Sequence, residues 1–108
     1  MGHSFPTDVV FDECQITRGV RPLTRHGWVI IRRNGSITLL GTKGDLIDSA
    51  RVSATTARPI PIPGARAVAL VIAGRTYIVT PRWGSRGRPT SGARAGLTAS
   101  QTLLAAVT

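Results

Sequence analysis

The sequence predicts a mainly β fold, a small antiparallel barrel or sandwich that is closed or nearly closed, with one short C-terminal helix. Two apolar segments are each divided by a turn signal, as in a β-hairpin, and only residues 97–107 have helical periodicity. A chain of 108 residues supports one hydrophobic core. We therefore expect a β domain over residues 1–81, with a flexible start at 1–7, then an Arg/Gly-rich linker or arm at 82–96 and the helix.

The first predicted hairpin spans Gly27–Thr42 and turns at Asn34-Gly35. An Asn-Gly pair suits a two-residue type I′ turn, because both residues tolerate a positive φ. That turn places seven apolar residues on two faces: Trp28, Ile30, Ile37 and Leu39 on one, and Val29, Ile31 and Leu40 on the other. Since both faces are apolar, we expect the second face to be covered by another segment or to be a partner surface.

Single strands and connectors surround this hairpin. Apolar residues alternate with polar ones over Asp8–Thr17, which predicts a first strand, and Arg18–His26 is expected to be a basic turn region. A turn at Lys43-Gly44-Asp45 leads to a half-exposed strand over Leu46–Thr56. Asp48 falls on the apolar side of that strand, where solvent or a nearby arginine would satisfy it.

A second hairpin is predicted from Arg66–Ala73 and Thr76–Thr80, with a type II′ turn at Gly74-Arg75. This turn would pair Ile72 with Tyr77. Before it, the prolines of segment 59–64 lack the N–H group that a central strand needs, so this segment is a connector or an edge.

The C-terminal helix is predicted over Leu97–Val107. Thr98 and Gln101 fit a capping box, and the apolar side carries Leu103, Leu104 and Val107. So short a helix is marginal alone in water, so we expect it to dock on the β core or on a partner.

Charge is the main outlier of the composition. Fourteen Lys and Arg residues oppose five Asp and Glu residues, for a net charge of +9, and every acid precedes Ser49. This imbalance indicates an anionic partner, namely nucleic acid, a lipid head group or an acidic protein face, or else a genome whose base composition favours Arg codons. The candidate contacts with an anionic partner are Arg32, Arg33, Arg75, Arg82, Trp83, Arg86, Arg88 and Arg94.

No pattern in the sequence predicts catalysis. There is no nucleophile elbow, phosphate loop or dinucleotide fingerprint, and His3 and His26 are each alone in a predicted loop. Cys14, the single cysteine, is expected to be a small buried hydrophobe. We therefore expect no enzyme activity, no cofactor, no metal and no small-molecule substrate. With no signal peptide or membrane-length apolar run, a cytoplasmic location is expected, with the virion as the alternative.

Two stretches of the chain resemble bacterial PH-like domains. They are GSITLLGTKGDLIDSARV at 35–52 and ALVIAGRTYIVTP at 69–81, and the resemblance covers about residues 28–81. It implies a bent seven-stranded barrel, closed at one end by a C-terminal helix, with a binding or scaffolding role rather than catalysis. Phosphoinositide-binding members carry a long basic loop between their first two strands, which the Asn34-Gly35 turn would not provide.

Three functions follow from these patterns. The first is a non-enzymatic binding or scaffolding domain that contacts a protein or an anionic surface. The second is a small structural subunit of a larger assembly, such as a phage head or tail component, which predicts self-association. The third is a nucleic-acid-binding module that uses the arm at 82–96, and its affinity should fall steeply with salt.

Overall fold

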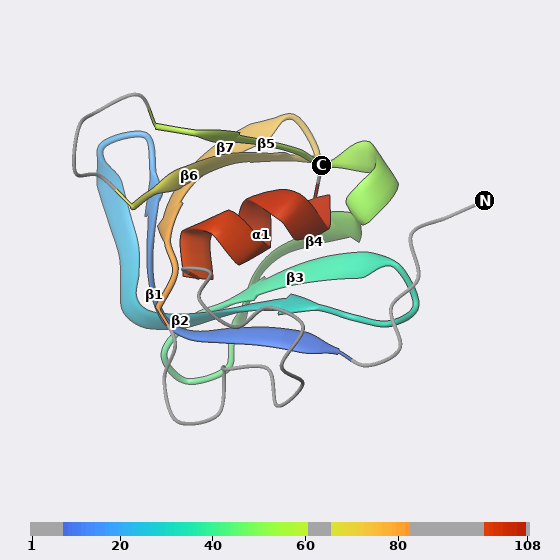
Figure 1. The fold of residues 1–108 in the computed structure, drawn as a ribbon. Helices are drawn as coiled ribbons and strands as arrows, with labels where there is room; N and C mark the ends of the chain where they lie inside the picture. Colours follow the sequence, from blue (N-terminus) through green and yellow to red (C-terminus); the bar gives the residue numbers. More distant parts are fainter. Residues whose placement is uncertain (1–7, 61–65, 83–98, 108) are drawn as a thin grey trace.

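One antiparallel sheet of seven strands and one helix make up the part of the chain that the computed structural model describes, residues 8–60, 66–82 and 99–107 (Figure 1). The strands are β1 (Val9–Arg18), β2 (Arg21–Ile31), β3 (Ser36–Leu40), β4 (Leu46–Arg51), β5 (Thr56–Pro59), β6 (Val68–Ile72) and β7 (Arg75–Thr80). A 3₁₀ turn, η1 (Val52–Ala54), links β4 to β5, and helix α1 (Ala99–Val107) follows the sheet.

The sheet has the strand order β4-β3-β2-β1-β7-β6-β5 and bends around α1, as Figure 1 shows. Every ladder joins strands that are neighbours in the chain, except the one between β1 and β7. No ladder joins β4 to β5 within the described strands, so the sheet is not closed. The predicted mainly β fold with a short C-terminal helix is confirmed.

The core lies on the concave face of the sheet, between the strands and α1. Its largest fully buried side chains are Tyr77, Phe11, Ile16, Ile31, Ile37, Leu39, Leu70, Ile72 and Leu103. The helix packs against β5 and β6 and buries Leu103 and Val107. Docking of the predicted helix on the β core is therefore confirmed for residues 99–107, whereas Thr98, its predicted cap, lies outside the described residues.

Strand β1 has a bulge at Glu13, whose φ is 55°. The register against β2 shifts between Phe11 and Cys14, as a bulge requires. Cys14 is fully buried, as predicted, and its thiol donates to the carbonyl of Phe11 at 3.1 Å. The bulge turns the Glu13 side chain outward on the other side of the strand.

The prediction of a basic turn region over Arg18–His26 is wrong. Only Gly19 and Val20 form the turn, and β2 starts directly at Arg21, which pairs with Arg18. Strand β3 pairs only with the second half of β2, from Trp28 onward. Among the described strands, the first half of β2 therefore pairs only with β1, and its other edge tolerates a proline such as Pro22.

The predicted register of the first hairpin is wrong by one residue. Ile31 pairs with Ile37 and Trp28 with Leu40. The turn is a longer one, in which Gly35 has a φ of 90° and donates its N–H to the carbonyl of Arg32 at 2.9 Å. A type I turn followed by a left-handed glycine has this geometry, so the predicted type I′ turn is not formed.

This shift of one residue exchanges the faces of one strand relative to the other. Val29 and Ile31 share the buried face with Ile37 and Leu39, whereas Trp28, Ile30 and Leu40 lie half-buried on the outer face. The predicted grouping of Trp28 and Ile30 with Ile37 and Leu39 is therefore wrong.

The strand predicted over Leu46–Thr56 ends at Arg51, where η1 follows, and β5 begins only at Thr56, the last residue of the predicted range. The break lets the chain leave one edge of the sheet, β4, and enter the opposite edge, β5. Pro59 ends β5, an edge strand, as the missing N–H of proline predicts. The rest of the proline-rich segment, residues 61–65, lies outside the described residues.

The second hairpin turns one residue earlier than predicted, at Ala73-Gly74, which have φ values of 51° and 79°. Two positive φ angles fit a type I′ turn rather than type II′. Leu70, not Ile72, pairs with Tyr77, so the register differs by two residues. An even shift preserves the faces, so Ile72 and Tyr77 still share one face, where they lie buried with Leu70.

Gly27 lies where β2 passes closest to its neighbours. A Cβ atom at this position would stand 2.5 Å from Cγ2 of Thr24 and 2.6 Å from the carbonyl oxygen of Leu40. Because the Leu40 oxygen belongs to the backbone of β3, it cannot move aside without disturbing the ladder.

We expect Gly27→Ala to lower the free energy of unfolding by about 2 kcal/mol through overpacking. Urea denaturation followed by circular dichroism measures this loss. Gly44→Ala is a useful comparison, because the added Cβ there meets nothing within 4 Å and only the positive φ of 81° is strained. An unchanged stability of Gly27→Ala would contradict the close approach of β2 and β3.

No helix of the described residues is long and apolar enough to cross a membrane.

Candidate functional site

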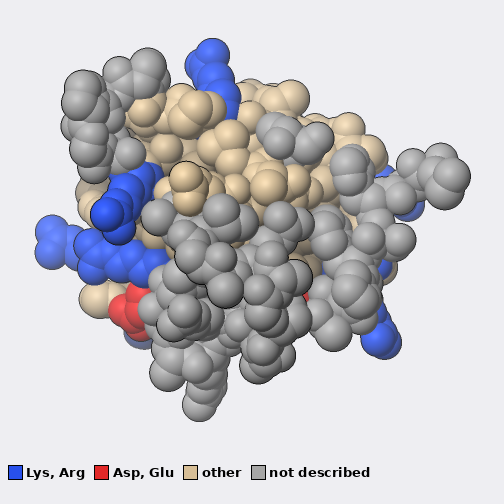
Figure 2. Space-filling model, viewed as in Figure 1, with Lys and Arg blue, Asp and Glu red and all other residues tan. Residues whose placement is uncertain are grey.

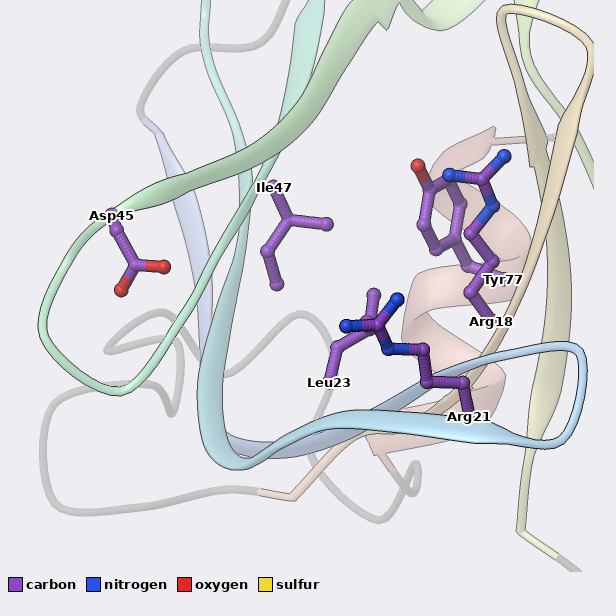
Figure 3. Close-up of a pocket in the computed structure, with 6 residues that line it drawn as sticks. All are labelled: Arg18, Arg21, Leu23, Asp45, Ile47 and Tyr77. Atoms are coloured by element: carbon purple, nitrogen blue, oxygen red, sulfur yellow. The ribbon is translucent and has the colours of Figure 1, made fainter.

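A hollow of about 300 Å³ opens at the end of the sheet where β1 turns into β2 and β3 into β4 (Figure 3). Its six lining residues come from four strands and the β3–β4 turn: Arg18, Arg21, Leu23, Asp45, Ile47 and Tyr77. Such a volume suits a small ligand group rather than a large cofactor.

One wall of the hollow carries two arginines, Arg18 and Arg21. They are directly opposed partners of the β1–β2 ladder, because the Gly19-Val20 turn between them contains only two residues. Opposed residues project to the same face, and like charges in this position repel each other. Neither guanidinium has a carboxylate within ion-pair distance among the residues that the structure describes.

Figure 2 shows Lys and Arg side chains gathered at the left of the view, where Figure 1 places the β1–β2 hairpin. Asp and Glu atoms also show at the lower edge of this group, so the hairpin that carries Arg18 and Arg21 lies on a side of the molecule where basic side chains outnumber acidic ones. A cluster of this kind destabilises the isolated domain and is relieved by an anion.

Tyr77 reaches the hollow from β7 and is the cross-strand partner of Arg18. The residue is 2% exposed, and its hydroxyl donates to Oδ2 of Asp48 at 2.7 Å. Burial and then this hydrogen bond raise the pKa of Tyr77. The phenol is therefore a fixed neutral group at neutral pH.

Asp48 anchors this side of the hollow. It is 7% exposed and accepts hydrogen bonds from Arg75 at 2.8 Å (Nε) and 3.1 Å (Nη2), as well as from Tyr77 and from the backbone N–H of Ser49. The bonds from Arg75 and then Tyr77 lower the pKa of Asp48 to about 2 against the opposing effect of burial. The expectation that an arginine would satisfy Asp48 is confirmed.

The wall opposite the arginine pair carries Asp45, as Figure 3 shows. The 41–45 turn is closed by two backbone hydrogen bonds, Gly41 to Asp45 at 2.7 Å and Gly44 to Gly41 at 2.9 Å. The Asp45 carboxylate packs against Gly41, where an added Cβ would stand 2.6 Å from Oδ1. No side-chain hydrogen bond or ion pair of Asp45 is found with the rest of the described chain.

Exposed apolar side chains surround the same hollow. Val20 is 99% exposed between the two arginines, Leu46 is 67% exposed beside Asp45, and Leu23, 37% exposed, lines the hollow. These three are the only exposed large hydrophobic residues of the described chain. Their gathering at one end indicates an interaction surface rather than scattered exposure.

The arginines predicted from sequence to contact an anionic partner are not brought together at this hollow. Arg32 and Arg33 flank the turn at the far end of β2. The Arg32 guanidinium stands 4.0 Å from the Asp8 carboxylate, which also accepts the backbone N–H of Arg33 at 2.8 Å. Arg75 is engaged with Asp48, and Arg82 is exposed after β7. Four predicted contacts lie outside the described residues: Trp83, Arg86, Arg88 and Arg94.

His26 is not alone in a loop, as the sequence suggested. It lies on β2, and its Nδ1 is 2.8 Å from Oε2 of Glu13, which the β1 bulge turns toward it. Both side chains are more than half exposed. Across residues 8–60, 66–82 and 99–107, no three His, Cys, Asp or Glu side chains are grouped to hold a metal ion.

The Cys14 thiol is not suited to act as a nucleophile. Burial raises the pKa of its thiol to about 12, so the thiol is protonated near neutral pH.

Sequence reasoning missed the residues of the hollow. The basic composition of Arg18–His26 predicts a loop there, although the pattern Arg-Gly-Val-Arg contains a usable signal, since a central glycine permits a two-residue turn that opposes the arginines. Asp45 and Tyr77 gave no signal, because their approach depends on contacts between distant strands.

No family model, no curated protein and no solved structure matches the chain.

Proposed function

We propose that the domain is a non-catalytic binding module that docks on an anionic surface with the end of the sheet that carries the hollow. The observation that supports this most directly is the opposed pair Arg18 and Arg21, whose charges no carboxylate of the described chain neutralises within ion-pair distance. An oxyanion between the two guanidinium groups would remove their repulsion and accept their hydrogen bonds.

The fold supports the same proposal. The strand number and the C-terminal helix are those that the PH-like resemblance implies, although no ladder closes the sheet into a barrel within the described strands, and on these two features we propose a PH-like domain. The first two strands of the structure are β1 and β2, and their turn contains only Gly19 and Val20. Charge is therefore supplied by the ends of these strands rather than by a long basic loop.

The exposed apolar residues favour a lipid surface over a protein surface. Val20, Leu23 and Leu46 are all aliphatic, whereas the anchor residues of protein interfaces are enriched in Trp and Tyr. Aliphatic side chains flanked by arginines suit insertion at the boundary between head groups and acyl chains.

Removing the arginine pair should weaken binding to anionic vesicles. We expect Arg18→Gln/Arg21→Gln to lower the affinity for phosphatidylcholine vesicles that contain phosphatidylglycerol by about 30-fold, since each basic residue near such a surface contributes about 1 kcal/mol. Co-sedimentation of the full chain with the vesicles measures the affinity, and vesicles of phosphatidylcholine alone, which have no net charge, give the baseline.

The matched control is Arg33→Gln/Arg51→Gln, which removes the same charge from two exposed side chains at the opposite end of the β2–β3–β4 region. We expect the loss of affinity in this control to be several-fold smaller than the loss in Arg18→Gln/Arg21→Gln. Equal losses of affinity in the two double variants would mean that only the net charge of the chain matters, which would contradict a docking site at the hollow. If the wild-type chain binds no anionic vesicle, an acidic protein surface becomes the better candidate partner.

A further inference from the structure

We infer that the hollow selects a zwitterionic ligand, in which a phosphate group is joined by a short apolar linker to a primary ammonium group whose N–H groups can donate to the Asp45 carboxylate. This inference rests on the proposed function, because it places the anion between Arg18 and Arg21, and it adds the role of the opposite wall. That wall carries the carboxylate of Asp45, which would repel a ligand that has only negative charge.

The two walls carry charges of opposite sign that do not neutralise each other. Arg18 and Arg21 stand on the β1–β2 side and Asp45 on the β3–β4 side, with no ion pair between them. Figure 3 shows both walls facing the same space, with Ile47 between them. A ligand with one anionic and one cationic end can satisfy both walls at once.

The lining between the charged walls is apolar. Ile47, on β4, is half-buried against the core, and Leu23 lines the hollow from β2. Methylene groups between a phosphate and an ammonium would contact these side chains, whereas a second charged group in the middle of the ligand would lose its hydration there.

A phosphate fits the arginine wall better than a carboxylate does. A carboxylate has two oxygens in one plane, so it cannot accept from all the donors of two guanidinium groups. The three free oxygens of a phosphate monoester point in different directions and can accept hydrogen bonds from both groups. O-phosphoethanolamine has this composition. The head group of phosphatidylethanolamine carries the same phosphate and ammonium groups, but as a phosphodiester with two free oxygens, one for each guanidinium group.

Asp45→Asn gives the sharpest test of the inference, because it should weaken the binding of a phosphate ligand that has an ammonium group and strengthen the binding of one that lacks it. In the wild-type chain, we expect O-phosphoethanolamine to bind about 5-fold more tightly than propyl phosphate, which lacks the ammonium, as one exposed ion pair allows. In Asp45→Asn this preference should disappear. Propyl phosphate should bind Asp45→Asn more tightly than it binds the wild-type chain, because the carboxylate no longer repels it.

Titration of the full ¹⁵N-labelled chain by NMR measures both affinities and shows through the unshifted amides that the variant is folded. Arg18→Gln/Arg21→Gln should lose both ligands. Equal affinities of the two ligands for the wild-type chain, or an unchanged preference in Asp45→Asn, would overturn the inference.

The proposed function can fail separately. If neither free ligand binds while anionic vesicles still bind through the arginine pair, the zwitterion inference is wrong and the proposed function stands. If vesicle binding is also independent of Arg18 and Arg21, both are wrong. When O-phosphoethanolamine binds, vesicles in which phosphatidylethanolamine replaces part of the phosphatidylcholine, at constant phosphatidylglycerol, distinguish the sources. A gain in affinity that Asp45→Asn abolishes identifies a lipid head group, and no gain identifies the free compound.

Discussion

Replacing Leu103 with alanine is expected to lower the free energy of unfolding by about 3 kcal/mol and the melting temperature by about 15 °C. Leu103 is fully buried between α1 and the concave face of the sheet, so its removal leaves a cavity in the centre of the core. Helix α1 has nine residues and cannot persist alone in water, so loss of its main anchor loosens the whole helix. Thermal and urea unfolding followed by circular dichroism measure the effect.

Ala105→Ser is the control for Leu103→Ala. Ala105 lies on the exposed side of the same helix, and serine changes only the helix propensity there, by about 0.5 kcal/mol. A loss below about 1 kcal/mol in Leu103→Ala would show that α1 is not docked on the sheet in solution.

The second large effect concerns the buried carboxylate of Asp48. We expect Asp48→Asn to lower the free energy of unfolding by about 2 kcal/mol near neutral pH, because the amide keeps the shape of the side chain and loses the charge that Arg75 and Tyr77 stabilise. The loss is structural, since these bonds tie β4 to β7 across the bent sheet, where no ladder connects the two strands.

The pH dependence of this difference identifies its origin. The folded-state pKa of Asp48 is about 2 and the unfolded value is about 3.9, so the carboxylate stabilises the fold above pH 4. That contribution is lost as the pH falls from about 4 to about 2. The difference in unfolding free energy between wild type and Asp48→Asn should therefore shrink toward zero over this range, which urea titrations at several pH values would measure.

Tyr77→Phe separates the hydroxyl from the charge. It removes one hydrogen bond to Asp48, and we expect a loss of about 1 kcal/mol while most of the pH dependence persists. A constant difference between wild type and Asp48→Asn from pH 7 to pH 2 would contradict the pairing of Asp48 with Arg75.

The sequence was sufficient for the fold class, because the alternation of apolar residues and the glycines at turns act locally. It was not sufficient for the register of the first hairpin. Asn34-Gly35 is compatible with a two-residue turn and with the longer turn observed, where Asn34 Oδ1 accepts the Ser36 backbone N–H at 3.0 Å. Both faces of the hairpin are apolar, so hydrophobic patterning could not decide between the two registers.

The candidate site was harder to predict than the fold. The arginines chosen from sequence stood out by their density, whereas the hollow is built by strand pairing. Arg18 becomes a site residue because β1 continues to it and turns tightly, and Tyr77 because β7 pairs with β1. The sequence predicts an arginine as a possible partner of Asp48 but not which one. Arg75 lies 27 positions away, and a bent sheet is needed to bring the two residues together.

The single ladder between β1 and β7 has a consequence for the order of folding. β1–β4 and β5–β7 are each a run of hairpins that can form from contacts between neighbouring segments, whereas Gln15–Arg18 must find Tyr77–Thr80 across most of the chain. Closing so long a loop is slow, so this ladder is expected to form late. Because Arg18 and Tyr77 are partners within it, the hollow takes shape only at that step. A nascent or partly folded chain would thus hold the arginine pair but lack the complete pocket, which couples ligand recognition to the finished fold.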